Sequence, residues 1–296
     1  MTLYNQIDSN KRRSALLIGL FLIIVIALGW IISRVYNSPV ILYLAITISI
    51  VQALISYYSG DKVALAVSGA HEIQKKDNPR LWNLVENLCI SAGLPMPKVY
   101  IINDPAPNAF ATGRDPQHSS IAVTTGLLES LDKVELEGVV AHELSHVGNY
   151  DIRLMMIVVV LVGVIALISD LFLRFRFWFG GGDNDNRSSS GYLAIIAIVA
   201  AILAPIIAML IQLAISRKRE FLADSTGALM TRYPEGLASA LEKISSYKKP
   251  MQKVSSSTSH LFISNPFGKT GSYFSKILST HPPIEERIKN LRGMEK

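Results

Sequence analysis

Long apolar runs alternate with mixed segments along the chain. Each run, with its flanking residues, approaches the roughly 20 residues that a helix needs to cross a membrane. Within each pair of runs the separating stretch is short or polar, which is typical of a helical hairpin. The pattern therefore predicts four transmembrane helices in two hairpins, with spans at about residues 15–34, 39–58, 154–173 and 192–215.

The segment between the two hairpins, residues 60–150, has the mixed pattern of a compact polar unit. Asn78-Pro79 favours the start of a helix that continues through Leu88, because apolar residues recur there at helical spacing. Short runs of β-branched residues, bounded by Pro, Asp and Gly, then predict a small sheet. Its strands are expected at residues 99–102, 108–112 and 120–124.

Another helix is expected at the end of this polar unit. Asp132 or Ser130 can cap its N-terminus, and its first turn is acidic, as the helix dipole favours. Gly148-Asn149 supplies a stop signal. This helix leads directly into the third apolar run.

The C-terminal part of the chain completes the polar domain. Residues 217–245 have a helical pattern, the Ser- and Lys-rich residues 246–259 indicate a mobile connection, and a short helix is expected near Arg292. We therefore expect a mainly helical α+β protein. Its predicted parts are membrane hairpins at residues 1–59 and 151–216 and the two halves of one extramembrane domain at residues 60–150 and 217–296.

Composition and charge agree with a membrane protein. Hydrophobic residues make up 50% of the chain, and the single cysteine, Cys89, excludes both an internal disulfide and a cysteine-built zinc finger. The net charge is +6, but the basic clusters flank the apolar runs, so we interpret them as topology signals and expect no nucleic-acid partner. They place Lys11-Arg12-Arg13 and residues 217–219 on the cytoplasmic side of the plasma membrane.

The sequence Ala-His-Glu-Leu-Ser-His ends at residue 146 and lies on the helix predicted before the third run. Residues four apart are separated by about 40° around a helix, so His142 and His146 can present imidazole nitrogens to one metal. Glu143 lies about 100° from His142, which lets it act as a general base on water without being a ligand. This pattern predicts a Zn²⁺ hydrolase site with one metal ion per chain.

A catalytic zinc site has three protein ligands and one open position, so a third ligand is needed. Glu220 is the candidate, directly after the fourth apolar run, with Asp224 one turn further on the same helical face. Asp224 can then receive the free ring N–H of a ligating histidine. Two membrane crossings lie between His142 and Glu220, which returns Glu220 to the same side.

Other readings of these residues stay open. Glu220 and Asp224 could pair only with nearby basic residues or with lipid headgroups. The metal could be structural, in a membrane scaffold, although a structural site needs no base such as Glu143. A metal-dependent hydrolase of a non-peptide substrate would share the same chemistry.

Four motifs, in order, make the whole chain resemble the HtpX-like membrane zinc peptidases, relatives of the CAAX prenyl proteases. They are Asn-Ala-Phe-Ala-Thr-Gly at 108–113, His-Glu-Leu-Ser-His at 142–146, Glu-Phe-Leu-Ala-Asp at 220–224 and Ser-Thr-His-Pro-Pro-Ile-Glu-Glu-Arg at 279–287. The resemblance implies a zincin-like, thermolysin-type domain. With four predicted spans the chain is much shorter than the prenyl proteases, which argues against a large membrane chamber and prenyl-peptide specificity.

The resemblance also assigns roles to further residues. It implies that the stretch Asn108, Ala109, Phe110, Ala111, Thr112 and Gly113 forms an edge strand that pairs with an extended substrate. It implies that His281 donates a hydrogen bond to the developing oxyanion and that Arg287 orients the site by pairing with a carboxylate. The implied substrates are damaged or misassembled membrane proteins and unfolded polypeptides, while the sequence leaves the oligomeric state open.

Overall fold

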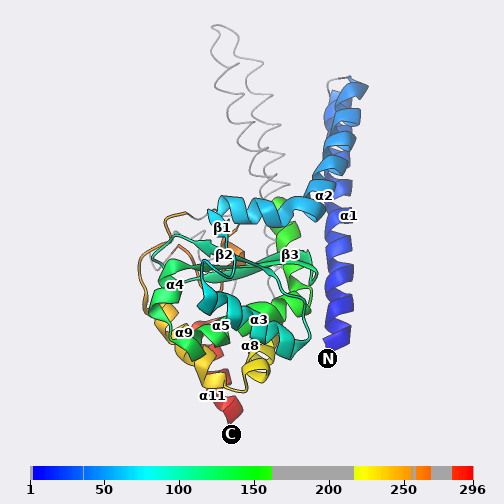
Figure 1. The fold of residues 1–296 in the computed structure, drawn as a ribbon. Helices are drawn as coiled ribbons and strands as arrows, with labels where there is room; N and C mark the ends of the chain where they lie inside the picture. Colours follow the sequence, from blue (N-terminus) through cyan, green and yellow to red (C-terminus); the bar gives the residue numbers. More distant parts are fainter. Residues whose placement is uncertain are drawn as a thin grey trace.

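The computed structural model describes residues 3–35, 37–161, 217–253, 255, 258–267 and 282–295 (Figure 1). The chain begins with a helical pair, α1 (Leu3–Val35) and α2 (Pro39–Val67). Ser38 and Pro39 start α2, since a proline at the first helical position sacrifices no intrahelical hydrogen bond. Figure 1 shows the end of α1 and the start of α2 side by side, projecting beyond the body of the molecule, while the start of α1 runs beside the body and the end of α2 lies across it.

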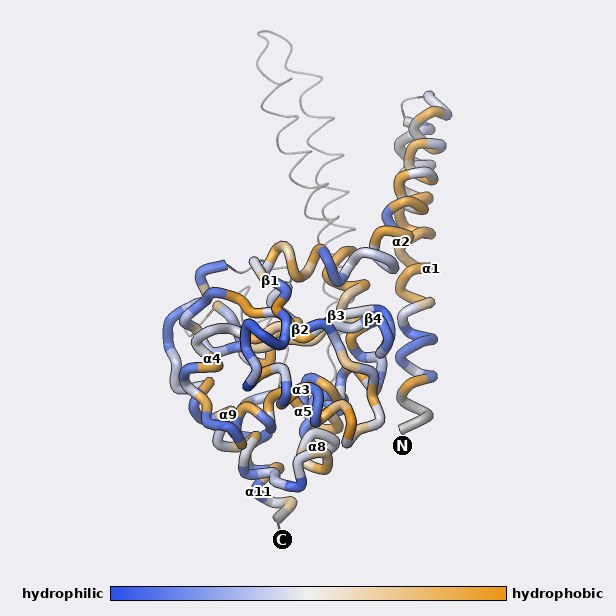
Figure 2. The backbone as a smooth tube through the Cα atoms, viewed as in Figure 1, coloured by the Kyte–Doolittle hydropathy of each residue, from blue (hydrophilic) through white to orange (hydrophobic). Residues whose placement is uncertain are grey.

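The projecting pair is apolar and exposed. Figure 2 shows hydrophobic residues along its far portion and hydrophilic residues on the part of α1 beside the body. Large apolar side chains that are more than about half exposed on α2 are Val40, Tyr43, Leu44, Ile48, Leu54 and Tyr58. An extended apolar surface of this kind indicates contact with lipid or protein.

Among the described residues, the segment Leu42–Val67 is long and apolar enough to cross a membrane. A second candidate arises only if Lys133–Gly148 and Asp151–Leu161, which are bent by 82°, count as one span. The helix at the predicted 39–58 span is longer than expected, because α2 continues to Val67. Apart from its first turns, through Leu161, the predicted hairpin 154–215 lies outside the described residues.

A four-stranded mixed sheet forms the upper layer of the body. Its order is β1 (Ala70–Glu72), β2 (Lys98–Ile102), β4 (His118–Thr124) and β3 (Ala109–Asp115). β2 and β4 run parallel, and the other two pairings are antiparallel. The three predicted strands are thus present with small shifts. β1 was not predicted, because it has only three residues and is partly exposed.

Helices cover the face of the sheet opposite α2 (Figure 1). They are α3 (Pro79–Ala92), the short α4 (Thr125–Ser130) and α5 (Lys133–Gly148). Asn78 caps α3 by accepting a hydrogen bond from Leu81 N at 3.0 Å, as its position before proline suggested. A core that includes Leu81, Ile121 and Leu136 fills the space between sheet and helices, and a second core around Phe110 lies on the α2 side.

The C-terminal part adds α8 (Arg217–Thr231), α9 (Pro234–Ser246), the 3-10 turn η1 (Ser259–Leu261), α11 (Ile284–Arg292) and the 3-10 turn η2 (Gly293–Glu295). Residues 217–245 are helical as predicted, but they form two helices and not a continuous one. The chain breaks at Arg232, which has a positive φ of 54°, and restarts at Pro234, which cannot donate an intrahelical hydrogen bond.

The Ser- and Lys-rich connection at residues 246–259 also differs from expectation. Met251 and Thr258 are buried, and Met251 N donates to Pro266 O at 2.9 Å. Gln252 N donates to the Asp104 carboxylate at 2.6 Å. The described part of this connection is therefore packed onto the body. Its buried side chains and backbone hydrogen bonds hold it there despite its mostly polar composition.

A capping box starts α5 and also joins it to α9. Asp132 and Glu135 each accept a hydrogen bond from the other's backbone N–H, as in the predicted cap. The buried Glu135 carboxylate also accepts hydrogen bonds from Ser239 Oγ and Lys243 Nζ, both at 2.7 Å. Burial opposes its charge, but the hydrogen bonds from Lys243, Ser239 and the Asp132 backbone together lower its pKa.

We expect Glu135→Gln to lower the free energy of unfolding by about 1–3 kcal/mol at pH 7, because it weakens charge-assisted hydrogen bonds to a buried carboxylate. Since the folded-state pKa is depressed, this contribution is present above the unfolded value of about 4.3 and disappears as pH falls through the folded-state pKa. Denaturation in detergent at several pH values measures it. Glu129→Gln, at an exposed position, is the control, and equal effects of the two variants would contradict the assignment.

Candidate metal centre

The centre is formed where α8 packs directly on α5. α5 is buried along almost its whole length and carries His142, Glu143 and His146, while α8 supplies Glu220 and Asp224. Gly227 permits the close approach, because a Cβ atom there would lie only 3.0 Å from the backbone N of His142. A larger residue at this position would push α8 away from the histidines.

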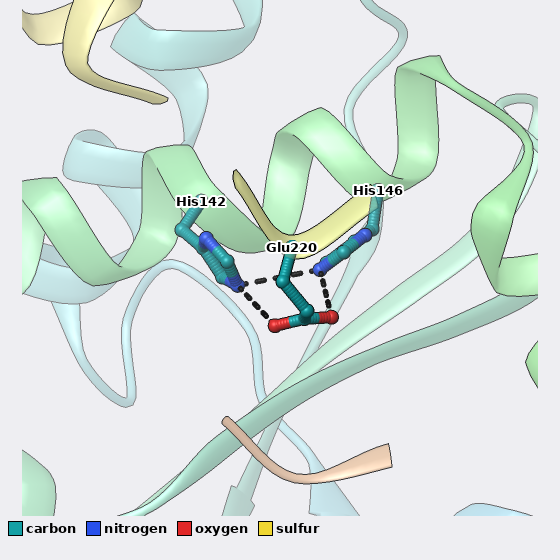
Figure 3. A group of neighbouring side chains, drawn as sticks. All are labelled: His142, His146 and Glu220. Atoms are coloured by element: carbon teal, nitrogen blue, oxygen red, sulfur yellow. Dashed lines mark hydrogen bonds and ion pairs between the residues drawn. The ribbon is translucent and has the colours of Figure 1, made fainter. Parts of the chain in front are cut away.

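Three side chains point toward one another between these helices (Figure 3). His142 Nε2 lies 3.3 Å from His146 Nε2. Glu220 places one oxygen 3.9 Å from His142 Nε2 and the other 3.6 Å from His146 Nε2. All three residues are buried, and their ligand atoms lie within 4.8 Å of one another.

This geometry and donor set suit a tetrahedral metal ion. Two nitrogens held at about 2.0–2.1 Å from a tetrahedral metal are about 3.3–3.4 Å apart, which matches the separation of the two Nε2 atoms. Imidazole and carboxylate are ordinary ligands of zinc and other divalent transition metals. His142, His146 and Glu220 could therefore hold one such ion.

The charge of the surroundings also fits a divalent cation. Four buried carboxylates gather here, those of Glu143, Asp151, Glu220 and Asp224, against the two buried guanidinium groups of Arg219 and Arg287. With neutral imidazoles these groups leave a formal charge of about −2, and buried charge is costly unless it is compensated. A divalent cation between the histidines would neutralise the cluster.

Each histidine is oriented by its own carboxylate. His142 Nδ1 lies 3.0 Å from Asp224 Oδ1, and His146 Nδ1 lies 3.1 Å from Asp151 Oδ2. An Nδ1–H donated to a carboxylate leaves the Nε2 lone pair directed at the centre. Burial disfavours the imidazolium of His146, but the hydrogen bond to Asp151 and the charges of Glu220, Asp151 and Glu143 outweigh it and raise its pKa to about 9.

Arg287, on α11, supports the two acidic residues of α8. Its Nε and Nη2 donate to the two oxygens of Asp224 at 2.9 and 2.7 Å, and its Nη1 lies 3.8 Å from Glu220 Oε2. Burial opposes the charge of Asp224, but the Arg287 charge and hydrogen bonds from His142 and Arg287 lower its pKa to about 2. A bidentate pair of this kind fixes the carboxylate in place.

The sequence reasoning placed most of these residues but missed Asp151, Arg219 and Asn10. Asp151 had a usable signal, because it is an acidic residue just beyond the Gly148-Asn149 helix stop and five residues after His146. The sequence pattern predicted a histidine partner only for Asp224. Asn10 lies on α1, and nothing in the sequence pattern connects it to the centre.

The structure describes one of the two side chains that were predicted to be catalytic. Glu143 is buried on α5 next to His142, and its charge acts on both His146 and Arg287. His281 lies outside the described residues.

The stretch expected to bind substrate forms β3 and the residue before it. β3 is at the edge of the sheet and packs against α5. Asn108 is buried and exchanges hydrogen bonds with the backbone of Ser264, at 3.0 and 3.3 Å. Ile263 N donates to Ala109 O at 3.0 Å, so the chain itself occupies the start of this edge.

Comparison with known proteins agrees with this geometry. The model of peptidase family M48 matches residues 75–295. The chain is 49% identical over 292 residues to the Protease HtpX homolog of Tropheryma whipplei (strain Twist), covering 99% of this chain and 98% of that protein. It is 46% identical over 300 residues to the Protease HtpX homolog of Lactobacillus acidophilus, covering 99% of this chain and all (100%) of that protein.

A solved structure has a similar fold. The crystal structure of S. mikatae Ste24p aligns with a TM-score of 0.52 and 18% sequence identity, over 97% of this chain and 67% of that chain. At this identity the likeness concerns the fold alone. The family match, the full-length relatives and the convergent ligand set lead to one conclusion, that the chain belongs to peptidase family M48.

Proposed function

We propose that the protein is a multi-pass membrane zinc endopeptidase that hydrolyses peptide bonds in damaged or misfolded membrane proteins and unfolded polypeptides. The observation that carries the proposal is the buried convergence of His142, His146 and Glu220 beside the carboxylate of Glu143 in a member of peptidase family M48. Such a ligand set leaves a metal position open for substrate, as hydrolysis requires.

Zinc bound by His142, His146 and Glu220 would lower the pKa of water and polarise the scissile carbonyl. Glu143 accepts the proton of the attacking water and later delivers it to the leaving amine. Asp224 and Asp151 hold the two imidazoles in the tautomer that binds metal. Arg287 holds the carboxylates of Asp224 and Glu220 in place. We assign to His281 the hydrogen bond that stabilises the oxyanion.

The pairing register of β3 with β4 determines which backbone groups of β3 face outward and are available to pair with a substrate. Thr124 N donates to Asn108 O, so the backbone groups of Asn108, and of every second residue after it, face β4. The groups of the intervening residues face outward, and Ala109 O already accepts from Ile263 N. We therefore assign the outward groups of Ala111 and Gly113 to pairing with an extended substrate, next to α5.

Four spans in two hairpins anchor the domain in the plasma membrane, with the active site on the cytoplasmic side. The exposed apolar surface of α2 supports the first hairpin. Glu220 lies beside His142, so the chain between them must end on the side where it began. This supports a second hairpin that crosses the membrane and returns. The basic residues Lys11, Arg12 and Arg13 at the body end of α1 favour a cytoplasmic location for that end.

The ligand assignment predicts unequal effects of two neighbouring acidic residues. Glu220→Ala removes a ligand and should abolish both stoichiometric zinc binding and peptidase activity. Asp224→Ala removes only an orienting partner and should weaken zinc affinity by about 10–100-fold. Metal analysis after purification in detergent measures both, and full zinc content in Glu220→Ala would refute the ligand assignment.

Glu143→Gln separates catalysis from metal binding. The amide keeps nearly the same shape but cannot take up a proton, so zinc content should stay at the wild-type value while the cleavage rate falls by about 10²–10⁴. Cleavage of an unfolded membrane-protein panel, with and without a chelator, measures the rate. Glu137→Gln on the same helix is the control. If wild type holds zinc tightly and cleaves nothing, a structural metal becomes the better explanation.

His281→Phe should retain zinc and the fold but lose about 10²–10³ in rate, which is the usual effect of removing one oxyanion donor. Turnover numbers of the zinc-loaded variant and of His118→Phe, a change at an exposed histidine, provide the comparison. Wild-type turnover in His281→Phe would remove His281 from the mechanism.

A further inference from the structure

Asn10 is a buried polar residue on the N-terminal helix α1, with an exposure of only 2%. Its amide nitrogen donates to Asp151 Oδ1 at 2.8 Å and to Asn149 O at 2.9 Å. Its amide oxygen lies 3.5 Å from Arg219 Nη1. One side chain of α1 thus contacts both segments that bring metal ligands together.

The contact with Asp151 leads directly to the metal centre. Asp151 uses one oxygen for Asn10 and the other for His146 Nδ1, at 3.1 Å. Arg219 Nε lies 3.6 Å from the oxygen shared with Asn10. Because a hydrogen-bonded carboxylate holds a ligating histidine in one orientation, whatever fixes Asp151 also fixes His146.

α1 also holds the turn on which Asp151 sits. Tyr150 has a positive φ of 61°, a conformation that costs a non-glycine residue energy and persists only where neighbours enforce it. Lys11 Nζ lies 4.5 Å from the centre of the Tyr150 ring, and the amide nitrogen of Asn10 donates to the carbonyl of Asn149. Consecutive residues of α1 therefore clamp the turn between α5 and the helix that follows.

We propose that Asn10 is a positioning residue for the metal centre, acting on His146 through Asp151. The inference rests on the proposed metal site and extends it to the N-terminal helix. The same helix continues into the apolar pair that projects from the body (Figure 2). The position of the first membrane hairpin is thereby coupled to the geometry of the ligands.

The test measures zinc affinity of the full chain in detergent by competition with a chelator of known affinity. Asn10→Ala should weaken zinc binding by about 10-fold, the low end of the range for groups that orient ligands. Asn10→Ser, which leaves room and polarity for water, should lie between the wild-type and Asn10→Ala values. Asp8→Ala, at an exposed position on the same helix, should leave affinity unchanged.

A double-mutant cycle distinguishes positioning from general destabilisation. If Asn10 acts through Asp151, the combination of Asn10→Ala with Asp151→Asn should bind zinc as weakly as Asp151→Asn alone. Additive losses, or unchanged affinity in Asn10→Ala, would overturn the inference. If Asn10→Ala does not fold, wild-type affinity in Asn10→Ser would overturn it equally. Absence of zinc binding by the wild-type chain would instead contradict the proposed function.

Discussion

A cluster of buried charged side chains lies between α5 and α8, and the packing around the candidate metal centre must compensate for it. The carboxylates of Glu143, Asp151, Glu220 and Asp224 outnumber the neighbouring guanidinium groups of Arg219 and Arg287, and all six side chains are buried. Such an arrangement is unfavourable unless a cation compensates it. Although burial opposes its charge, His146 has a pKa raised to about 9 by Asp151, Glu220 and Glu143, which reflects the same excess of negative charge. The close approach at Gly227 and the support from Arg287 both keep these groups together.

Local sequence patterns predicted the elements whose boundaries depend on local chemistry. The cap at Asp132, the cap at Asn78 and the histidine pair on one helical face follow from hydrogen bonds and spacing within a few residues. The order β1-β2-β4-β3 and the contact of Asn10 with Asp151 depend on how distant segments pack. Periodicity carries no signal for such contacts. The break at Arg232 was foreseeable from Pro234 but was overlooked because the flanking residues favour helix.

The N-terminal helix connects the projecting apolar pair with the candidate metal centre. An α-helix transmits displacement along its length, since its backbone hydrogen bonds make it a stiff element. In α1 the apolar surface and the buried Asn10 belong to one continuous helix, Leu3–Val35. The segment 259–264 adds a second constraint by covering the start of β3, which restricts the outward edge to Ala111 and Gly113.

The central claim is that two histidines and one glutamate hold a single zinc ion. X-ray absorption at the zinc edge, on the full chain purified in detergent without added metal, tests it most directly. We expect about one zinc per chain with a first shell of nitrogen and oxygen at about 2.0–2.2 Å, including the scattering pattern of imidazole. A sulfur shell at about 2.3 Å, which in this chain would require Cys89 or a methionine, or zinc well below one per chain, would contradict it.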